Sequence, residues 1–355
     1  MLAASIKKII DGCCENKFGA RDMQAINCEK DILGNGLLNS VIIGIGASLP
    51  KKYLTNFDLA EKMDTSDEWI TKRTGIKRRY IAGEGETTAS LATEAALSAL
   101  EQSKISPYDI DLIIVATASG DYTFPATAIL VQRTLGIREN CVAFDVNAAC
   151  SGFIFAIDVA DSYLKLGKSK CALVIGAETF SRLLDWSDRS TAVLFGDGAG
   201  AIVLQAQPSE SQRGIQSCRI YSDGAYVNEL KTSGGVSTTS NAGFVQMDGR
   251  CVFKNAIEKF SAMLTCAMAD NKLTIDDIDL IVPHQANARI IEKLIENFSI
   301  SRDKVLITVD KHANTSAASI PLSLNEVRDV VFSKKNVILL SMGAGFTWGY
   351  VFLKM

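Results

Sequence analysis

The chain has 355 residues, of which 47% are hydrophobic and 22% are charged. It is therefore long and apolar enough to bury a large core and to hold two domains or two fused halves, which excludes disorder as its main state. A net charge of −3 gives no overall basic field of the kind that binds nucleic acid. The nine cysteines are irregularly spaced without a CxxC pair, which argues against a disulfide framework or a metal site and favours a reducing cytosol.

Residues 1–39 are interpreted as an N-terminal extension of unknown role. Their first part lacks the apolar stretch of about 7 to 15 residues that marks a signal peptide. Acidic residues such as Glu15 and Asp22 argue against an organellar transit peptide. No stretch of the sequence reaches the roughly 18 apolar residues that a membrane span needs. We expect a cytoplasmic protein with neither a membrane nor a nucleic-acid partner.

The first predicted strand covers residues 41–45 and runs into the sequence GIGASLP. These glycines resemble part of a dinucleotide-binding fingerprint, but the third glycine is missing and Pro50 interrupts the position where a helix should begin. We therefore reject NAD binding. The glycine-rich stretches at 195–201 and 343–349 lack the Lys-Ser/Thr pair of a phosphate loop, and they predict tight backbone packing.

An internal repeat organises the rest of the chain. IDLIIVATAS begins at Ile110 and IDLIVPHQAN begins at Ile278, 168 residues later, and each copy follows a predicted helix. Each is followed by a further helix and a second predicted strand, at 142–146 in the first copy and at 305–309 in the second.

A third pair of apolar strands is predicted at 172–178 and 337–345. Strands that are apolar on both faces and alternate with helices are typical of parallel sheets covered on both sides. The polar stretch 206–214 separates the copies. The sequence therefore predicts an α/β fold with two pseudo-symmetric halves, residues 40–207 and 213–355.

Cys150 is the strongest candidate nucleophile. It follows the predicted strand 142–146 and precedes the apolar segment SGFIFAIDVADSYLKLG, which predicts a buried helix. Free N–H groups and the dipole at the start of a helix favour a thiolate and lower the thiol pKa. For the other cysteines, an inert place in the core is the better interpretation.

The chain has only two histidines, His284 and His312, and each is expected to follow a strand. His284 is favoured because side chains at the exits of buried parallel strands gather at α/β active sites. Asn314 lies in a predicted turn before another helix, where its amide could also serve only as a helix cap.

Six motifs in order resemble the β-ketoacyl-ACP synthase III family from about residue 40 to the C-terminus. They are TSDEWITKRTGI at 65–76, DVNAACSGF at 145–153, FGDGAGA at 195–201, VPHQAN at 282–287, HANTSAASIP at 312–321 and GAGFTWG at 343–349. The resemblance implies the five-layer αβαβα thiolase fold, formed by internal duplication, and a homodimer. It also implies that an acyl-CoA, with acetyl-CoA as the default starter, is condensed with malonyl-ACP to give 3-ketoacyl-ACP, CoA and CO2, which initiates type II fatty-acid synthesis.

The resemblance also implies roles for individual residues. Cys150 would form the acyl-enzyme, while His284 and Asn314 would stabilise the enolate that decarboxylation of malonyl-ACP yields. The backbone N–H groups of Cys150 and Ala344 would form the oxyanion hole. Acyl-CoA is a substrate, so neither a cofactor nor a metal is implied.

Further residues match binding positions of the family. CoA contacts are implied for four side chains: Thr65, Trp69, Arg73 and Arg189. Phe124 would reach across the dimer into the partner's acyl pocket, although a core phenylalanine is the ordinary interpretation. Lys254 and Arg289 would meet the acidic carrier protein, although each alone resembles common surface charge.

The sequence departs from the family pattern at Ala313 and Ala344, where many members have glycine, and in its N-terminal extension. A degradative thiolase would need a second cysteine near Gly343, whereas the last cysteine is Cys266. Elongating synthases use a second histidine where this chain has Asn314. A catalytically inactive binding partner and a cysteine hydrolase fit less well, and chalcone-synthase-like enzymes and secondary-metabolite relatives of synthase III remain the alternative.

Overall fold

The computed structural model describes residues 38–355, which belong to one compact unit. The extension predicted at residues 1–39 lies outside the described residues, except for its last two. Leu38 and Asn39 already belong to strand β1 (Leu38–Ser48), where they pair with the end of β7 (Gly198–Pro208).

The first large sheet has five strands. Their order is β1-β7-β6-β4-β5, with β6 at Cys171–Glu178, β4 at Leu112–Ala116 and β5 at Val142–Val146. β4 runs parallel to both β6 and β5, whereas β7 runs antiparallel to both of its neighbours.

The second large sheet repeats this order with four strands. They are β8 (Gly214–Ser222), β13 (Thr347–Lys354), β12 (Asn336–Gly343) and β11 (Leu280–Pro283). β11 is parallel to β12, while β13 is antiparallel to both neighbours. The predicted strands β4, β5 and β6 run parallel to one another, as do β11 and β12. Each sheet is nevertheless mixed, because β7 and β13 were not predicted as strands and run antiparallel to their neighbours.

The aspartate of the repeated IDLI sequence has the same structural role in both copies. Asp111 accepts hydrogen bonds from the backbone N–H groups of Lys170 and Cys171, at the start of β6. Asp279 accepts the equivalent bonds from Lys335 and Asn336, at the start of β12. The same side chain therefore sets the same strand register in both halves.

Residues 305–309, predicted as the second strand of the second repeat copy, do not form a strand. Val305 makes only an isolated bridge to β11, and Val309 already begins helix α12 (Val309–His312). The Gln285 side chain takes the backbone groups that a strand would pair, since its Oε1 accepts from Thr308 N at 2.7 Å and from Val309 N at 3.1 Å. A side chain has replaced part of a strand ladder here.

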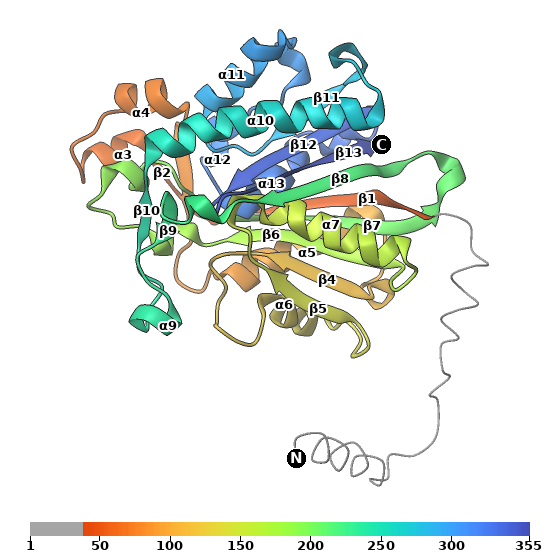
Figure 1. Cartoon of the computed structure of the whole chain (residues 1–355). Coiled ribbons are helices and arrows are strands. Elements are labelled where there is room, and N and C mark those ends of the chain that lie inside the picture. The colour runs from red at the N-terminus through yellow and green to blue at the C-terminus, as the bar shows by residue number, and fades with distance from the viewer. Residues whose placement is uncertain (1–37) are drawn as a thin grey trace, which may run out of the picture. The chain divides into compact units, whose positions relative to one another are not determined.

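The helices and sheets form five layers (Figure 1). Outside the first sheet lie α5 (Thr88–Ser103) and α6 (Thr127–Leu135); between the sheets lie α7 (Gly152–Lys165) and α13 (Ser319–Glu326); outside the second sheet lie α10 (Gly249–Asn271) and α11 (Ala288–Phe298). A separate apolar cluster fills each outer interface and a third fills the centre. The αβαβα architecture implied by the family resemblance is confirmed.

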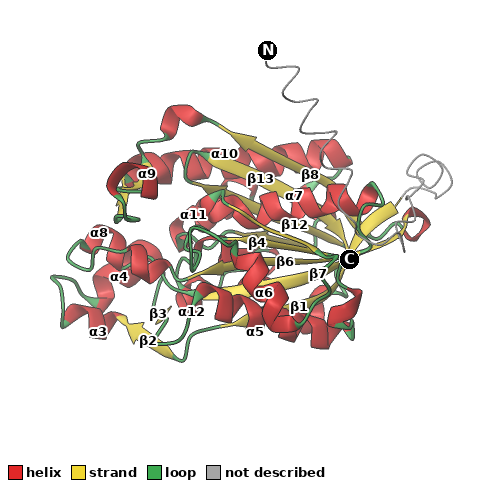
Figure 2. Cartoon of the chain, turned by 90° about the horizontal axis from the view of Figure 1, so that it is seen from below, coloured by secondary structure: helices red, strands yellow, loops and turns green. Residues whose placement is uncertain are grey.

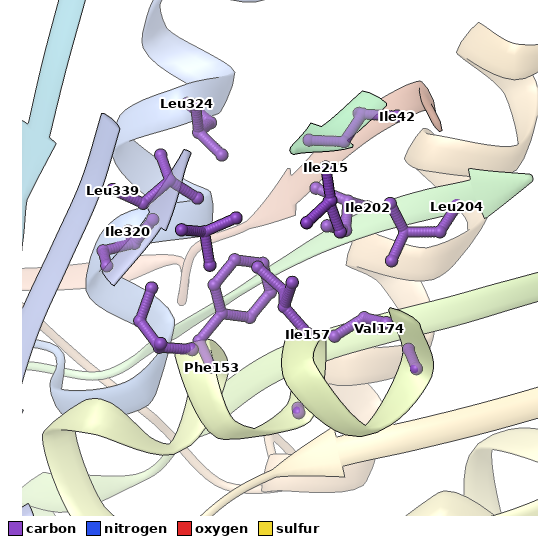
Figure 3. Packing of buried hydrophobic residues seen from close by; sticks show 14 of the residues in the cluster. Ile42, Phe153, Ile157, Val174, Ile202, Leu204, Ile215, Ile320, Leu324 and Leu339 are labelled. Carbon is purple, nitrogen blue, oxygen red and sulfur yellow. The ribbon is translucent and has the colours of Figure 1, made fainter. Parts of the chain in front are cut away.

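The central layer supplies the largest shared core. Phe153 and Ile157 of α7 pack toward Ile320 and Leu324 of α13, between side chains from the two sheets (Figure 3). Burial of apolar side chains of this size stabilises the fold by about 1.5 to 3 kcal/mol each. Because α7 begins directly after Cys150, this packing also fixes the position of the thiol.

Glycines allow the layers to approach one another closely. A Cβ atom on Gly44 would lie 2.4 Å from Ala99 O, and one on Gly46 would lie 2.3 Å from Ala99 N. The GIG sequence of β1 therefore serves the packing of α5 on the sheet, which agrees with the rejection of dinucleotide binding.

Smaller elements gather at one end of residues 38–355, opposite the C-terminus (Figures 1 and 2). They are β2 (Lys52–Thr55), α3 (Asn56–Ala60), α4 (Asp67–Thr74), β3 (Arg78–Ile81), α8 (Arg189–Ala192), β9 (Leu230–Thr232), α9 (Val236–Thr239) and β10 (Val245–Met247). A short helix α14 (Arg328–Val331) follows α13.

Candidate active site

Cys150 lies on a short 3-10 helix, Ala149–Ser151, which leads directly into α7. The Ser341 hydroxyl of β12 donates a hydrogen bond to the Cys150 carbonyl oxygen at 2.7 Å. Ala149 has a φ of 46°, an uncommon value for a residue with a side chain, and it marks a tight turn between β5 and the thiol. The predicted position at the N-terminal end of a buried helix is confirmed.

The loop after β12 packs directly on this turn. A Cβ on Gly343 would lie 2.8 Å from Cys150 N, so only glycine permits the approach. The Thr347 hydroxyl donates to Ala344 O at 3.0 Å, and the Ser151 hydroxyl donates to the Thr347 hydroxyl at 2.7 Å. These bonds hold the Ala344 segment against the segment that carries Cys150.

His284 directly follows β11 and is 2% exposed. The backbone N–H of His284 donates to Leu340 O at 2.8 Å, which continues the pairing of β11 with β12. Burial lowers the pKa of the imidazole to about 3, so the ring is neutral near pH 7. Nδ1 is enclosed without a hydrogen-bond partner in residues 38–355, which leaves Nε2 as the nitrogen able to meet a substrate.

Asn314 lies on a loop that crosses to the other half of the molecule. Its N–H donates to Leu194 O at 3.0 Å, and its carbonyl oxygen accepts from Gly196 N at 3.0 Å. Its side-chain Oδ1 accepts from Ser316 N at 2.9 Å. This bond supports the local turn but is not the helix cap considered from the sequence, because Thr315 is the N-cap of the 3-10 helix Ser316–Ala318 and α13 begins only at Ser319. The Nδ2 group of Asn314 remains able to donate.

Burial raises the pKa of the Cys150 thiol to about 12, and the nearby Glu178 carboxylate adds to this effect. The neighbouring Ser316 hydroxyl acts in the opposite direction. The expectation of a lowered thiol pKa considered only the helix terminus and omitted desolvation, which is the larger influence at this depth. The Cys150 side chain is therefore a protonated thiol near pH 7, and a reaction that used it as nucleophile would first have to remove this proton.

One pocket brings the three predicted catalytic residues together. Cys150, His284 and Asn314 all line it, and most of the remaining lining is apolar. The apolar residues include Phe195, Phe253, Phe260, Ile290, Met342 and Phe346. An open groove shares lining with this pocket at Leu194, Met247, Gly249, Phe253 and Asn287, so it gives access to the thiol from the surface.

A cationic aromatic cluster lies along the groove. Two guanidinium groups lie over the Trp69 ring of α4, with Arg73 Cζ 4.9 Å and Arg189 Cζ 5.0 Å from the ring centroid. The groove is also lined by Arg289, which is exposed at the start of α11. Such a site can stack a planar base and attract phosphate groups.

The other predicted binding residues do not line this groove. Thr65 is half-buried ahead of α4 and lines neither the groove nor the pocket. Lys254 is exposed on α10, next to the groove residue Phe253. Phe124 is 84% exposed, so the ordinary interpretation of a core phenylalanine is wrong, and it does not line its own chain's pocket.

Two residues near the site were not proposed from the sequence. Asn287 lines both pocket and groove and donates to Arg73 O at 3.1 Å, which joins α11 to α4. In the sequence, only its position three residues after His284 indicated that Asn287 could belong to the site. Glu178 is fully buried at the end of β6, and it was detectable as the one charged residue in the apolar stretch ALVIGAE.

Within residues 38–355, no three His, Cys, Asp or Glu side chains gather where they could hold a metal ion. None of the helices in this part of the chain has the length and hydropathy that a bilayer span requires.

Comparison with known proteins agrees with the motifs. Family models described as 3-oxoacyl-[acyl-carrier-protein (ACP)] synthase III and its C-terminal part match residues 144–224 and 268–355. The β-ketoacyl-[acyl-carrier-protein] synthase III of Rhizobium meliloti is 53% identical over 323 residues, covering 90% of this chain and 100% of that protein.

Solved structures give the same result. The 3-oxoacyl-[acyl-carrier-protein] synthase III of Aquifex aeolicus VF5 matches with a TM-score of 0.84 and 45% identity, covering 89% of this chain and 100% of that one. The priming β-ketosynthase of the R1128 polyketide pathway also reaches 0.84, at 30% identity over 90% of this chain and 97% of that one. From its fold, motifs and these likenesses, the chain belongs to the β-ketoacyl-ACP synthase III family.

Proposed function

We propose that this protein is an acyltransferase that condenses a starter acyl-CoA with malonyl-ACP to give 3-ketoacyl-ACP, CoA and CO2, and so initiates type II fatty-acid synthesis. The observation that carries this proposal is the shared pocket, where a thiol at a helix start faces the same space as His284 and Asn314. A relative that is named for this activity is 53% identical to this chain, which supports the proposal.

In the first step, Cys150 attacks the thioester carbonyl of the acyl-CoA, and CoA leaves as the acyl-enzyme forms. The oxyanion that develops on this carbonyl is stabilised by the backbone N–H groups of Cys150 and Ala344. The close packing of Gly343 on Cys150 supports this pairing, because it holds the two backbone segments side by side. Oxyanion donors of this kind contribute roughly 3 to 4 kcal/mol to transition-state stabilisation.

In the second step, malonyl-ACP loses CO2, and the resulting enolate attacks the acyl group on Cys150. His284 Nε2 and Asn314 Nδ2 donate hydrogen bonds to the thioester carbonyl, on which the enolate charge develops. Both donors are neutral, since burial lowers the pKa of His284 to about 3. Their contribution in this pocket comes from preorganised dipoles in a site largely shielded from water.

The groove is the proposed approach for both substrates. Trp69, Arg73 and Arg189 would hold the adenine and phosphate end of CoA, with Thr65 as a neighbouring contact, and the connected pocket would receive the pantetheine arm. Lys254 and Arg289 are exposed near the groove and would attract the acidic carrier protein.

We further propose a homodimer that works in the cytoplasm without a metal or a bound cofactor. β5 ends the order of the first sheet, and Val142 at its start is 44% exposed, so this edge can pair with a second copy. The exposed Phe124 would then enter the partner's acyl pocket. Acetyl-CoA is the proposed starter.

The test is to incubate the protein with a panel of acyl-CoAs, then with malonyl-ACP, and to follow the masses of both proteins. Acetylation of Cys150 followed by formation of acetoacetyl-ACP is the expected result. Acylation by another starter would change the assigned substrate. Acylation without condensation would favour the specialised polyketide relatives, and no acylation by any acyl-CoA would refute the proposed function.

A further inference from the structure

Glu178 is a fully buried carboxyl group for which the reaction described above has no use. It ends β6, and its hydrogen-bond donors are all uncharged groups of the loop after β4. Ala118 N lies 3.2 Å from Oε1, Thr117 Oγ1 lies 3.3 Å from Oε2, and the Ser119 hydroxyl also donates to Oε2. No ion pair reaches it within residues 38–355. Burying a carboxylate without a countercharge costs several kcal/mol, which a purely structural residue would not require.

The segment that carries Ser316 packs against both the strand that ends at Glu178 and the turn that carries Cys150. A Cβ on Gly176 of β6 would lie 2.2 Å from Ala317 O, and one on Gly152 at the start of α7 would lie 3.6 Å from Ala317 Cβ. The segment 316–318 is therefore packed against both the strand that ends at Glu178 and the turn that carries Cys150.

The Ser316 hydroxyl is free to serve both neighbours. It is fully buried and has no hydrogen-bond partner of ordinary distance and angle in the described chain. It nevertheless lies near enough to lower the pKa of both the Cys150 thiol and the Glu178 carboxyl. Hydrogen bonds that act in catalysis are often long in the free enzyme and shorten when substrate binds.

The first step needs a proton acceptor, and the pocket offers few. Burial lowers the pKa of His284 to about 3, which makes it a weak base, and raises the pKa of Cys150 to about 12. Burial also raises the pKa of Glu178 to about 7, a value suited to accepting and returning a proton. The titratable groups around this path are Cys150, Glu178 and, across the pocket, His284, while the donors from the loop after β4 are neutral.

We propose that Glu178 accepts the thiol proton of Cys150 through the Ser316 hydroxyl when the acyl-enzyme forms, and returns it when the condensation product leaves. This inference rests on the proposed role of Cys150 as the nucleophile. Glu178 touches no substrate, so it is a positioning residue that also stores one proton.

The steps balance in atoms and charge. The S–H bond of Cys150 breaks as the thiol proton passes to Ser316, and Ser316 passes its own proton to Glu178. Sulfur bonds to the acyl carbon, and the CoA thiolate leaves and takes a proton from solvent. After the enolate attacks, the bond between the acyl carbon and sulfur breaks, and the Cys150 thiolate recovers the proton that Glu178 held.

The test measures alkylation of Cys150 by iodoacetamide against pH, with Cys150→Ala as the background for the other cysteines. In the wild type, the rate should rise as pH increases through about 7, where Glu178 loses its proton. Glu178→Gln and Ser316→Ala should each lower the rate at pH 7.5 by about a hundredfold and move its rise to higher pH. Asp111→Asn is the matched control, because Asp111 accepts backbone N–H bonds at the opposite end of the same strand.

An equal or faster alkylation of folded Glu178→Gln would overturn the proposal, because a carboxylate that only repels the thiolate gives that result. If Glu178→Gln does not fold, Ser316→Ala decides, and an unchanged pH profile in that variant contradicts the relay. Alkylation needs no acyl-CoA. A wild type that acetyl-CoA does not acylate, but that shows the expected alkylation profiles, would refute the proposed function and leave the relay standing.

Discussion

The two halves share one strand order but differ in the segments that lead to their proposed catalytic residues. In the first half, a regular fifth strand, β5, runs into Cys150 and the N-terminal end of α7. In the second half, the equivalent segment is no strand, and it leads to Asn314 through a loop supported by Gln285. The first arrangement holds the Cys150 thiol inside its own half, whereas the second brings the Asn314 amide across to the other half.

This difference has a local physical origin. A strand ladder fixes the chain within one sheet, but Asn314 has to hydrogen-bond to Leu194 and Gly196 of the other half. Supporting the segment by a side chain leaves the following backbone free to take unusual angles. Ala313 has φ 60° and ψ −160°, and Ser316 has φ 49°. Two halves with the same strand order thus carry unlike candidate positions, because Gln285 holds the segment that forms a strand in the first half.

Removing the proposed nucleophile should have the largest effect on activity. Variants in the first half should lose acylation, whereas variants in the second half should lose condensation. We expect Cys150→Ala to abolish acylation and to reduce turnover by about 10⁴-fold or more. Asn314→Ala and His284→Ala should still be acylated, but should lose condensation by about 10² to 10³-fold. Intact-mass analysis with acetyl-CoA, then product analysis with malonyl-ACP, measures both steps. Cys141→Ala should retain both steps, and an acylated Cys150→Ala protein would contradict the nucleophile assignment.

Removing the Gln285 side chain tests whether it holds the segment that forms a strand in the first half. Gln285→Ala leaves the buried N–H groups of Thr308 and Val309 without an acceptor, so we expect a loss of about 3 kcal/mol in the free energy of unfolding. Urea denaturation measures it. Gln132→Ala, which removes a glutamine bonded at the surface to Arg138 O, should lose under about 1 kcal/mol. Equal midpoints for the two variants would show that the segment does not depend on Gln285.

The pH dependence of stability should distinguish His284 from an ordinary surface histidine. Its folded pKa of about 3 lies below its usual value of 6.5, so the unfolded chain binds the proton more readily. Its contribution to stability is therefore complete above pH 6.5 and falls as pH decreases toward 3, by about 1.4 kcal/mol per pH unit. Between pH 7 and pH 5, the wild type should lose about 2 kcal/mol more stability than His284→Gln in urea titrations. Parallel losses would show that the imidazole is not buried in its neutral form.

The smallest expected effect concerns the backbone before Asn314. Ala313 occupies a backbone region that is costly for residues with a side chain, so Ala313→Gly should stabilise the fold by about 1 kcal/mol. Ala96→Gly in the middle of α5 should have the opposite sign and similar size. Thermal unfolding of the two variants measures this. Destabilisation by Ala313→Gly would show that the methyl group contributes more through packing than it costs in strain.

Much of the site was predictable because its residues follow sequence features with a fixed structural meaning. His284 lies directly after β11 and Cys150 lies four residues after the end of β5, both in a detectable repeat, and parallel strands bring such positions to one edge. Phe124 carries no comparable local signal, and the single charge of Glu178 in an apolar stretch does not by itself indicate burial. Exposure of the first and burial of the second depend on contacts between segments far apart in the sequence.

The sequence by itself determined the two-half α/β organisation, the absence of a dinucleotide motif and the identity of the three residues that share the pocket. The repeat and the strand exits depend on local pattern, which one chain displays directly. Only the tertiary structure decided that the sheets are mixed, that residues 305–309 are held by Gln285, and that the Cys150 thiol is too deeply buried to ionise at rest. All three depend on how distant segments pack together: the direction of each strand, the support of a segment by the Gln285 side chain, and the desolvation of the thiol. No local sequence pattern encodes them.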